Sequence, residues 1–196
     1  MIKNPIHLRL AKLDIWQLRV FMAVLCERMY PNFVLYSKQI ESEDYKVFKS
    51  VLDLVWESMI TRKAKINFDN QLEKLEEIIP TVSDESLYTI YPAIDACQGL
   101  VELLHAILSG EEVERAIDIS QISLKTIIEL EEAKLGNPLS EDELKNFEPV
   151  ADELDFQWEI YRLLLSEENY NIELIKGIKE ELREELISNI GVFLSD

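Results

Sequence analysis

The sequence predicts an all-α protein, a multi-helix bundle of about eight to ten helices. Apolar residues recur at the three- and four-residue spacing of an α-helix along most of the chain, and no segment keeps the alternation of a β-strand. Glycine is rare, with 5 residues in 196, as expected for a chain with few tight turns. Helix start and stop signals recur throughout and leave only short connections.

The N-terminal half begins with two well-marked helices. Pro5 opens a short one, because a proline at the first helical position loses no hydrogen bond. The Asp14-x-x-Gln17 pattern resembles a capping box and opens a second helix to about Tyr30, where Pro31 should stop it. This second helix is apolar almost all round, so we expect it at the centre of the fold. The helices expected next are a short one near 33–39, one from Ser42 to about Ile60, and one from Asn67 or Asp69 to Pro80.

The C-terminal half carries the same kinds of boundary. Gly110 and Gly136 follow amphipathic segments, at the position where a helix C-cap favours glycine. Ser140-x-x-Glu143 is a full capping box. The helices expected from these signals run from Pro92 to Ser109, from about Glu111 to Leu135, from Pro149 to about Ser166, and from Asn169 or Asn171 to about Ser188.

We expect residues 1–196 to form a single domain. The length suits one domain, and a chain of this size buries roughly 70% of the surface that its unfolded form exposes. The best candidate for a boundary is GNPLS at 136–140, near which the charge balance also changes. Because amphipathic helices flank this stretch closely, we interpret it as a seam between sub-bundles.

The net charge of −18 is unevenly distributed. Residues 1–110 carry 15 acids and 12 bases, whereas residues 111–196 carry 23 acids and 8 bases. A surface this acidic repels phosphate backbones and anionic lipids, so we expect neither a nucleic-acid partner nor a membrane partner. A basic protein partner is permitted, although solubility is the commoner reason for such a charge.

The cysteines and the apolar runs indicate a soluble, cytoplasmic protein. Cys26 and Cys97 stand in apolar surroundings and form no C-x-x-C motif, which favours two free thiols in a reducing compartment. The N-terminus shows no signal peptide, and the apolar run VFMAVLC is far shorter than the roughly 20 residues of a spanning helix.

Several classes of chemistry lack their motifs. The five glycines are at least 11 residues apart, which excludes the glycine-rich loops that bind nucleotides and the G-x-S-x-G turn of hydrolases. Only His7 and His105 are present, and no cluster of Cys and His has zinc spacing. We therefore predict no cofactor, no metal site and no catalytic residue.

One polar stripe stands out on the helix expected at 92–109. Asp95, Gln98, Glu102, His105 and Ser109 recur at the spacing of one helix face, and the other residues of this segment are apolar or Gly. Glu102-x-x-His105 has the spacing of a di-iron ligand pair, but a second such pair is missing. We favour a core helix with a thin solvated edge. The alternatives are a partner or ligand surface formed by the first four residues, and a metal site.

Two acidic pairs suggest an alternative enzymatic function. Glu129-x-x-Glu132 and Asp152-x-x-Asp155 lie on neighbouring predicted helices, and several carboxylates of this kind can bind Mg²⁺. Helical nucleotide pyrophosphohydrolases use such pairs. Because the chain holds 38 acids, pairs at this spacing also arise by chance. The hypothesis requires all four carboxylates to converge.

Seven stretches together resemble the YjaG family of bacterial proteins. In chain order they are NPIHLRL (4–10), FMAVLCERMYPN (21–32), LDLVWE (52–57), INFDNQLEKLEEIIP (66–80), YPAIDAC (91–97), QWEIYRLL (157–164) and IELIKGIKEELREELISNIG (172–191). The resemblance covers nearly the whole chain. It implies an all-helical, single-domain, cytoplasmic protein of unknown function, and it brings no catalytic residues to carry over.

The function that these observations favour is not enzymatic. We expect a helical interaction or regulatory protein that binds a protein partner, which includes a second copy of itself as a homodimer. A Mg²⁺-dependent hydrolase that uses the two acidic pairs is the first alternative. The second is a small-molecule binder with an interhelical pocket lined by Cys26, Trp56 or Tyr91.

Overall fold

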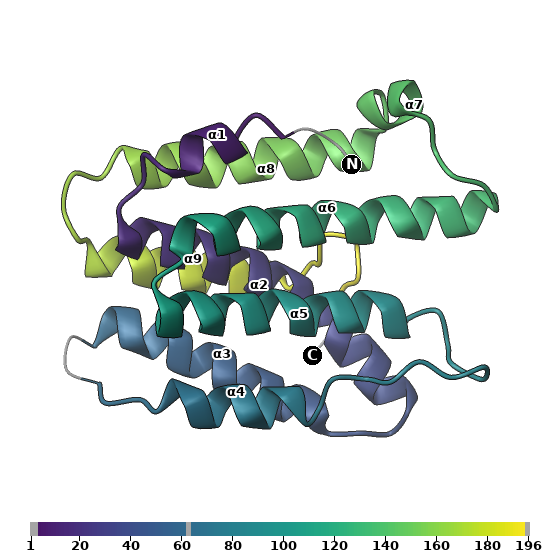
Figure 1. Cartoon of the computed structure of the whole chain (residues 1–196), viewed down its shortest axis with the longest axis horizontal. Coiled ribbons are helices and arrows are strands. Elements are labelled where there is room, and N and C mark those ends of the chain that lie inside the picture. The colour runs from purple at the N-terminus through teal and green to yellow at the C-terminus, as the bar shows by residue number, and fades with distance from the viewer. Residues whose placement is uncertain (1–3, 62–63, 195–196) are drawn as a thin grey trace.

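The computed structural model describes residues 4–61 and 64–194, which fold into nine helices (Figure 1). The predicted all-α class is confirmed. The described residues contain no β-strand, only an isolated bridge between Ile187 and Phe193. The helices are α1 (His7–Leu10), α2 (Ile15–Gln39), α3 (Asp44–Ile60), α4 (Phe68–Glu76), α5 (Ile90–Ser109), α6 (Glu112–Leu135), α7 (Glu141–Lys145), α8 (Glu148–Leu165) and α9 (Ile172–Glu185).

Helix α2 lies at the centre of the fold, as its apolar sequence indicates. It contacts α3, α5, α6, α8 and α9, and almost every side chain from Gln17 to Val34 is buried. The largest fully buried side chains of the core include Phe21 of α2 itself and Phe48 and Trp56 of α3. Even so, none of the described helices is long and apolar enough to cross a membrane.

The prediction that Pro31 stops the second helix is wrong. Helix α2 continues through Pro31 to Gln39, so the separate helix expected at 33–39 is its C-terminal part. Proline inside a helix removes one backbone hydrogen bond and typically costs about 3 kcal/mol. Here the continuation places Phe33 and Val34 in the core, where they are 1% and 3% exposed. Their burial offsets the cost of the proline.

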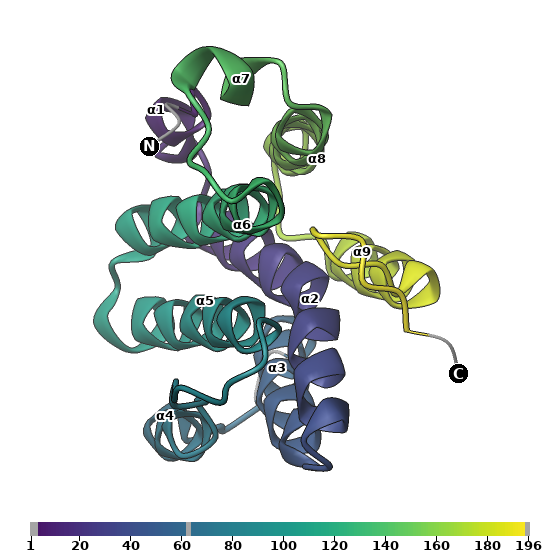
Figure 2. The ribbon, with the colours of Figure 1, turned by 90° about the vertical axis from the view of Figure 1, so that its right-hand side faces the viewer.

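The other helices surround α2 in layers (Figure 2). α4, α5, α6 and α8 follow one another across the molecule, each in contact with the next, and α9 packs against α2 and α3. α1 lies on α6, beside α8. Helix α6 is therefore held between α5 and α8, while a further face of it remains open to solvent.

Helix α5 approaches α2 closely at Gly99. A Cβ atom at this position would lie 2.6 Å from Met29 Cε and 3.8 Å from Cys26 Sγ. Cys26 and Cys97 are both free and buried, and burial raises the pKa of both thiols. They act as small apolar side chains here, as expected from their surroundings.

Most predicted helix boundaries agree with the structure. Asp14 N–H donates to Gln17 Oε1 at 2.6 Å, and Ser140 N–H donates to Glu143 Oε2 at 2.8 Å, so both capping boxes form. Several boundaries differ. The first helix begins at His7, after a turn that includes Pro5, and α5 begins at Ile90, before Pro92. α4 ends at Glu76, short of Pro80, and α9 ends at Glu185. The chain beyond α9 turns back to form the Ile187–Phe193 bridge.

Candidate interaction groove on helix α6

A groove runs along α6, bounded by α5 and by the segment 136–147 that joins α6 to α8. Its volume is about 570 Å³. Helix α5 contributes Glu102, and the joining segment contributes Leu139 and Leu144. The residues of α6 in the lining are Asp118, Gln121, Ile122, Leu124, Lys125, Ile128, Glu129 and Glu132.

The amphipathic sequence of α6 explains how one helix serves both core and groove. Ala116, Ile119 and Ser123 recur at helical spacing and are buried. A neighbouring face carries Ile122 and Ile128, which are partly buried and also line the groove. The groove therefore has an apolar floor between polar edges.

The charged groups of the groove are mostly acidic. Lys125 Nζ lies 2.8 Å from Asp95 Oδ1 and 3.2 Å from Glu129 Oε2, so neighbouring carboxylates neutralise this cation. Glu102 Oε2 lies 2.6 Å from Arg115 Nη1. The groove thus presents one base against four acids, which are Glu102, Asp118, Glu129 and Glu132.

Asp118 is the groove acid whose charge is most clearly disfavoured. Burial raises the pKa of its carboxyl, Glu102 and Glu114 raise it further, and Arg115 opposes them. Ionised Asp118 therefore costs stability above its raised pKa, and this cost disappears as the pH falls through that pKa.

Replacing Asp118 with Asn should therefore stabilise the protein at pH 7, by at most about 0.5 kcal/mol because the site is partly solvated. The gain should shrink as the pH falls toward 3.8, the ordinary value for this carboxyl. Urea unfolding at several pH values measures the gain in stability and its dependence on pH. The control is Glu180→Gln, at an exposed acid on α9. If the gain in stability did not depend on pH, it would not come from the charge of Asp118.

The predicted polar stripe of α5 does not form one solvated edge. Gln98 is exposed, and Glu102 and His105 are half-buried. Asp95 is only 3% exposed, and its carboxylate accepts from Lys125 Nζ and from Thr126 Oγ1 at 2.9 Å. The prediction is wrong for Asp95 because α6 packs against this part of α5. Of the five stripe residues, only Glu102 lines the groove.

The two acidic pairs are not brought together. Glu129 and Glu132 line the groove, where Glu132 Oε1 accepts from Leu139 N–H at 2.9 Å. Asp152 and Asp155 are both exposed, and Asp152 lines a different cavity. Among the described residues, no three acids, histidines or cysteines converge as metal ligands would. The convergence required by the Mg²⁺ hydrolase hypothesis is absent from these four carboxylates.

The residues suggested for an interhelical small-molecule pocket also lie elsewhere. Cys26 and Trp56 are fully buried in the packed core. Tyr91 is 43% exposed, and its ring lies 5.6 Å from that of Tyr88 on the surface. These three side chains therefore line no common pocket.

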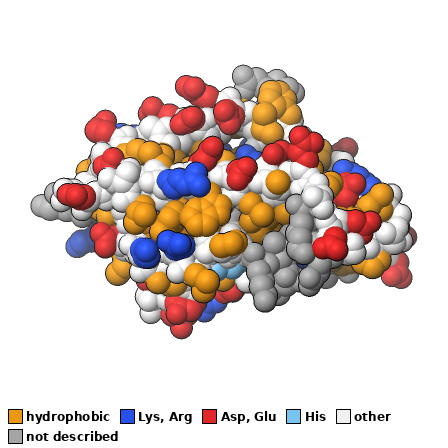
Figure 3. Space-filling view, turned by 90° about the horizontal axis from the view of Figure 1, so that it is seen from above, with side chains coloured by type: hydrophobic (Ala, Val, Ile, Leu, Met, Phe, Trp, Pro, Cys, Tyr) orange, Lys and Arg blue, Asp and Glu red, His pale blue; other side chains and the backbone are white. Residues whose placement is uncertain are grey.

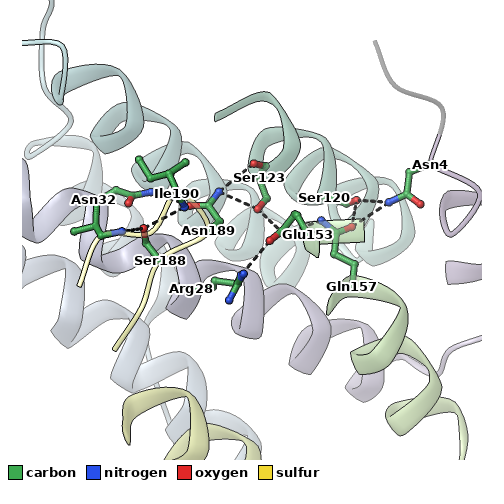
Figure 4. Close-up of polar contacts among 11 residues, drawn as sticks. Asn4, Arg28, Asn32, Ser120, Ser123, Glu153, Gln157, Ser188, Asn189 and Ile190 are labelled. Atoms are coloured by element: carbon green, nitrogen blue, oxygen red, sulfur yellow. Dashed lines mark hydrogen bonds and ion pairs between the residues drawn. The ribbon is translucent and has the colours of Figure 1, made fainter. Parts of the chain in front are cut away.

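A chain of buried hydrogen bonds joins α6 to α8 (Figure 4). Ser123 Oγ donates to Glu153 Oε1 at 2.7 Å, and Gln157 Nε2 donates to the same oxygen at 3.0 Å. The other Glu153 oxygen accepts from Arg28 Nε at 3.0 Å. Ser120 Oγ donates to Gln157 Oε1 at 2.6 Å. Because each group is held by the next, this network sets the register of α6 against α8 and α2.

Residues near both ends of the described part of the chain join this network. Asn4 Nδ2 donates to Gln157 Oε1 at 3.1 Å, and Asn189 Nδ2 donates to the backbone oxygen of Ser123 at 3.0 Å. Asn32 Nδ2 in turn donates to Asn189 Oδ1 at 3.0 Å. Sequence reasoning missed this network. Its only local signal is that serines interrupt the apolar face of α6.

A second buried acid joins α2 to α9. Arg183 Nε donates to Glu27 Oε1 at 2.8 Å, and Trp56 Nε1 donates to Glu27 Oε2 at 2.8 Å. Arg183 Nη2 also reaches Asp53 Oδ1 at 2.6 Å. The Glu27 side chain is 6% exposed, so its charge depends on these partners.

The upper face of the molecule, over α1 and α8, differs from the groove (Figure 3). Apolar side chains lie along the middle of this face with Lys and Arg beside them, and Asp and Glu lie mostly toward its rim. Leu8 on α1 is 87% exposed, and Leu163 and Leu165 on α8 are 39% and 44% exposed. This face therefore has an apolar middle with Lys and Arg beside it and acids toward its rim.

Comparisons with known proteins identify relatives across nearly the whole chain. Residues 5–193 match the model of the family described as "Protein of unknown function (DUF416)". The chain is 51% identical to "Uncharacterized protein YjaG" of Salmonella typhimurium and 50% identical to that of Escherichia coli K12, over 98% of each chain. An "Uncharacterized protein" of Haemophilus influenzae is 52% identical over 97% of each chain.

The same architecture occurs in a solved structure. The crystal structure of a DUF416 family protein from Shewanella baltica OS155 matches this fold with a TM-score of 0.90 and 32% sequence identity. The match covers 98% of this chain and 100% of that chain. The names of these relatives assign no activity.

Proposed function

This chain belongs to the DUF416 family, and we propose that it is a cytoplasmic interaction protein that binds a basic amphipathic helix of another protein in the α6 groove. The observation that carries the proposal is the combination of an apolar floor, which includes Ile122 and Ile128, with four acids at the edges. An amphipathic helix places its apolar face in such a groove, and its basic residues pair with the acids.

The charge of the whole molecule supports this choice of partner. Residues 111–196, which include α6, have a net charge of −15. The negative electrostatic field of this charge steers a basic partner toward the surface and speeds association. Lys125 pairs with Asp95 and Glu129, and Arg115 pairs with Glu102. Asp118 and Glu132 form no ion pair with any described residue, so they supply the uncompensated negative charge of the groove.

The length of the groove defines the length of the partner segment. Asp118 and Glu132 mark its ends on α6 and are 14 residues apart, or about 21 Å along the helix. A partner helix of about four turns would span this distance with basic residues at both ends.

A cytoplasmic location fits the two free cysteines. Cys26 and Cys97 are buried and unpaired with each other. Unpaired buried thiols of this kind are typical of proteins from reducing compartments.

The test uses a fluorescent 14-residue peptide of leucine and lysine, patterned as an amphipathic helix, and fluorescence anisotropy at physiological salt. The double variant Asp118→Lys, Glu129→Lys should bind the peptide at least about tenfold more weakly than the unmodified chain. The matched control is Glu180→Lys, Glu184→Lys, which changes the net charge equally at exposed positions on α9. Its affinity should change by less than about twofold.

Equal losses in the two double variants would mean that the peptide senses only net charge, and this would overturn the proposal. Light scattering tests a second copy as the occupant. Self-association that is lost in the groove variant, but retained after Leu8→Glu on the upper face, would assign the groove to a homodimer and overturn the basic-helix proposal. Thermal unfolding by circular dichroism verifies that each variant is folded.

A further inference from the structure

A second cavity, separate from the groove, lies where α6, the start of α8 and the segment 188–191 meet α2. Its volume is about 330 Å³, and it is partly enclosed. Arg28 and Asp152 contribute charged groups to it, and Phe147 and Ile190 contribute apolar ones. This volume is at the lower end of the range for small-molecule sites.

Arg28 is held in one orientation at this cavity. Its Nε donates to Glu153 Oε2 at 3.0 Å (Figure 4), and its guanidinium carbon lies 4.2 Å from the ring centroid of Phe156. Glu153 is itself fixed by Ser123 and Gln157. The Arg28 side chain is 20% exposed, and within the described residues its two terminal nitrogens have no hydrogen-bond acceptor. Arg28 therefore offers a preorganised pair of donors, which suits a carboxylate.

The other charges of the cavity restrict its ligand. Glu131 and Lys134 also line it and lie 3.4 Å apart, so they compensate each other. Asp152 forms no ion pair with any described residue of the chain. Glu153 offsets the charge of Arg28, so a simple anion would gain the two free donors of Arg28 but be repelled by Asp152. A simple cation would pair with Asp152 but leave these donors unused. A ligand that carries both a carboxylate and an ammonium group satisfies both side chains.

The remaining walls are mostly apolar. Ile127, Leu130, Phe147 and Ile190 line the cavity and can cover an apolar side chain of a ligand. Ser188 contributes a hydroxyl that accepts from Ile190 N–H at 3.2 Å and from Val192 N–H at 2.9 Å. Its own O–H proton remains able to donate to a ligand oxygen.

We propose that this cavity binds a free α-amino acid with an apolar side chain, with the ligand carboxylate on Arg28 and the ligand ammonium on Asp152. The site is independent of the α6 groove. Binding there would connect the level of a small metabolite to the packing of α8 and the segment 188–191 against α2 and α6, because Glu153 and Asn189 belong to the same buried network.

Isothermal titration calorimetry of the whole chain tests the proposal with L-leucine, L-methionine and L-phenylalanine. At least one should bind saturably with a Kd below about 1 mM. Two matched probes then remove one charge each from L-leucine. These are 4-methylpentanoate, which lacks the amine, and 3-methylbutylamine, which lacks the carboxylate. Both should bind at least about tenfold more weakly than the corresponding amino acid.

Two variants assign the contacts. Arg28→Lys keeps a positive charge beside Glu153 but lacks the paired donors, and Asp152→Asn removes the ammonium partner. Each should weaken amino-acid binding at least about tenfold. Asp155→Asn, one turn along α8 at an exposed position outside the cavity, should leave it unchanged. Failure of all three amino acids to bind would overturn the proposal, as would equal effects of Asp152→Asn and Asp155→Asn.

Discussion

Replacing Glu153 with Ala is expected to lower the free energy of unfolding by about 3–5 kcal/mol, the usual cost of breaking a buried ion pair from one side. The Glu153 side chain is fully buried, and it holds Arg28, Ser123 and Gln157. Its removal leaves a partly buried cation without its partner and also takes away the acceptor of two buried donors. Urea unfolding followed by circular dichroism measures the change.

Two variants separate the charge of Glu153 from its hydrogen bonds. Glu153→Gln keeps the size and an acceptor oxygen but loses the ion pair, so it should cost less than Glu153→Ala. Asp155→Ala removes an exposed acid of the same helix and should change the stability by no more than about 0.5 kcal/mol. If Glu153→Ala were as mild as Asp155→Ala, the buried network would not hold α8 in place.

Arg183→Ala should have the second largest effect, a loss of about 3 kcal/mol. Glu27 is buried within α2, and Arg183 on α9 donates to both of its oxygens, at 2.8 and 3.1 Å. Without Arg183 a buried carboxylate keeps only the Trp56 N–H as its partner in the described chain. We expect α9 to be the helix most loosened, because its contacts are with α2 and α3.

A double variant tests whether the penalty comes from the unpaired charge. Glu27→Gln, Arg183→Met removes both charges and keeps an acceptor for Trp56, so it should be more stable than Arg183→Ala alone. Lys176→Ala, which removes an exposed ion pair on α9, is the matched control and should cost less than about 0.5 kcal/mol. If the double variant were as unstable as Arg183→Ala, the loss of stability would not come from the unpaired charge of Glu27. Hydrogen exchange of α9 amides locates the loosening.

Much of the secondary structure could be predicted because its signals are local. Asp14 with Gln17, and Ser140 with Glu143, form their capping boxes within one turn of helix. Gly110 and Gly136 adopt the left-handed conformation at helix ends. The exception is Pro31, where the local signal to stop is real but the burial of the following residues outweighs it.

The candidate site was only partly predictable. Glu102, Glu129 and Glu132 were each singled out from helical spacing, although in two different hypotheses. The structure brings them to one groove because α5 and α6 are neighbours. The apolar contribution of Leu139 and Leu144 could not be foreseen, since it depends on how the segment between α6 and α8 folds back over α6.

The sequence by itself determined the all-α class and the central place of α2, because these depend on composition, periodicity and local caps, and it indicated the family through the resemblance of seven stretches. The tertiary structure alone decided which polar residues are buried. Asp95 and Gln98 share a stripe, as Asp152 and Glu153 share a turn, yet in each pair one side chain is buried and the other exposed. Periodicity places a residue around the axis of its own helix. Only the packing of neighbouring helices decides whether that side meets water or another chain segment.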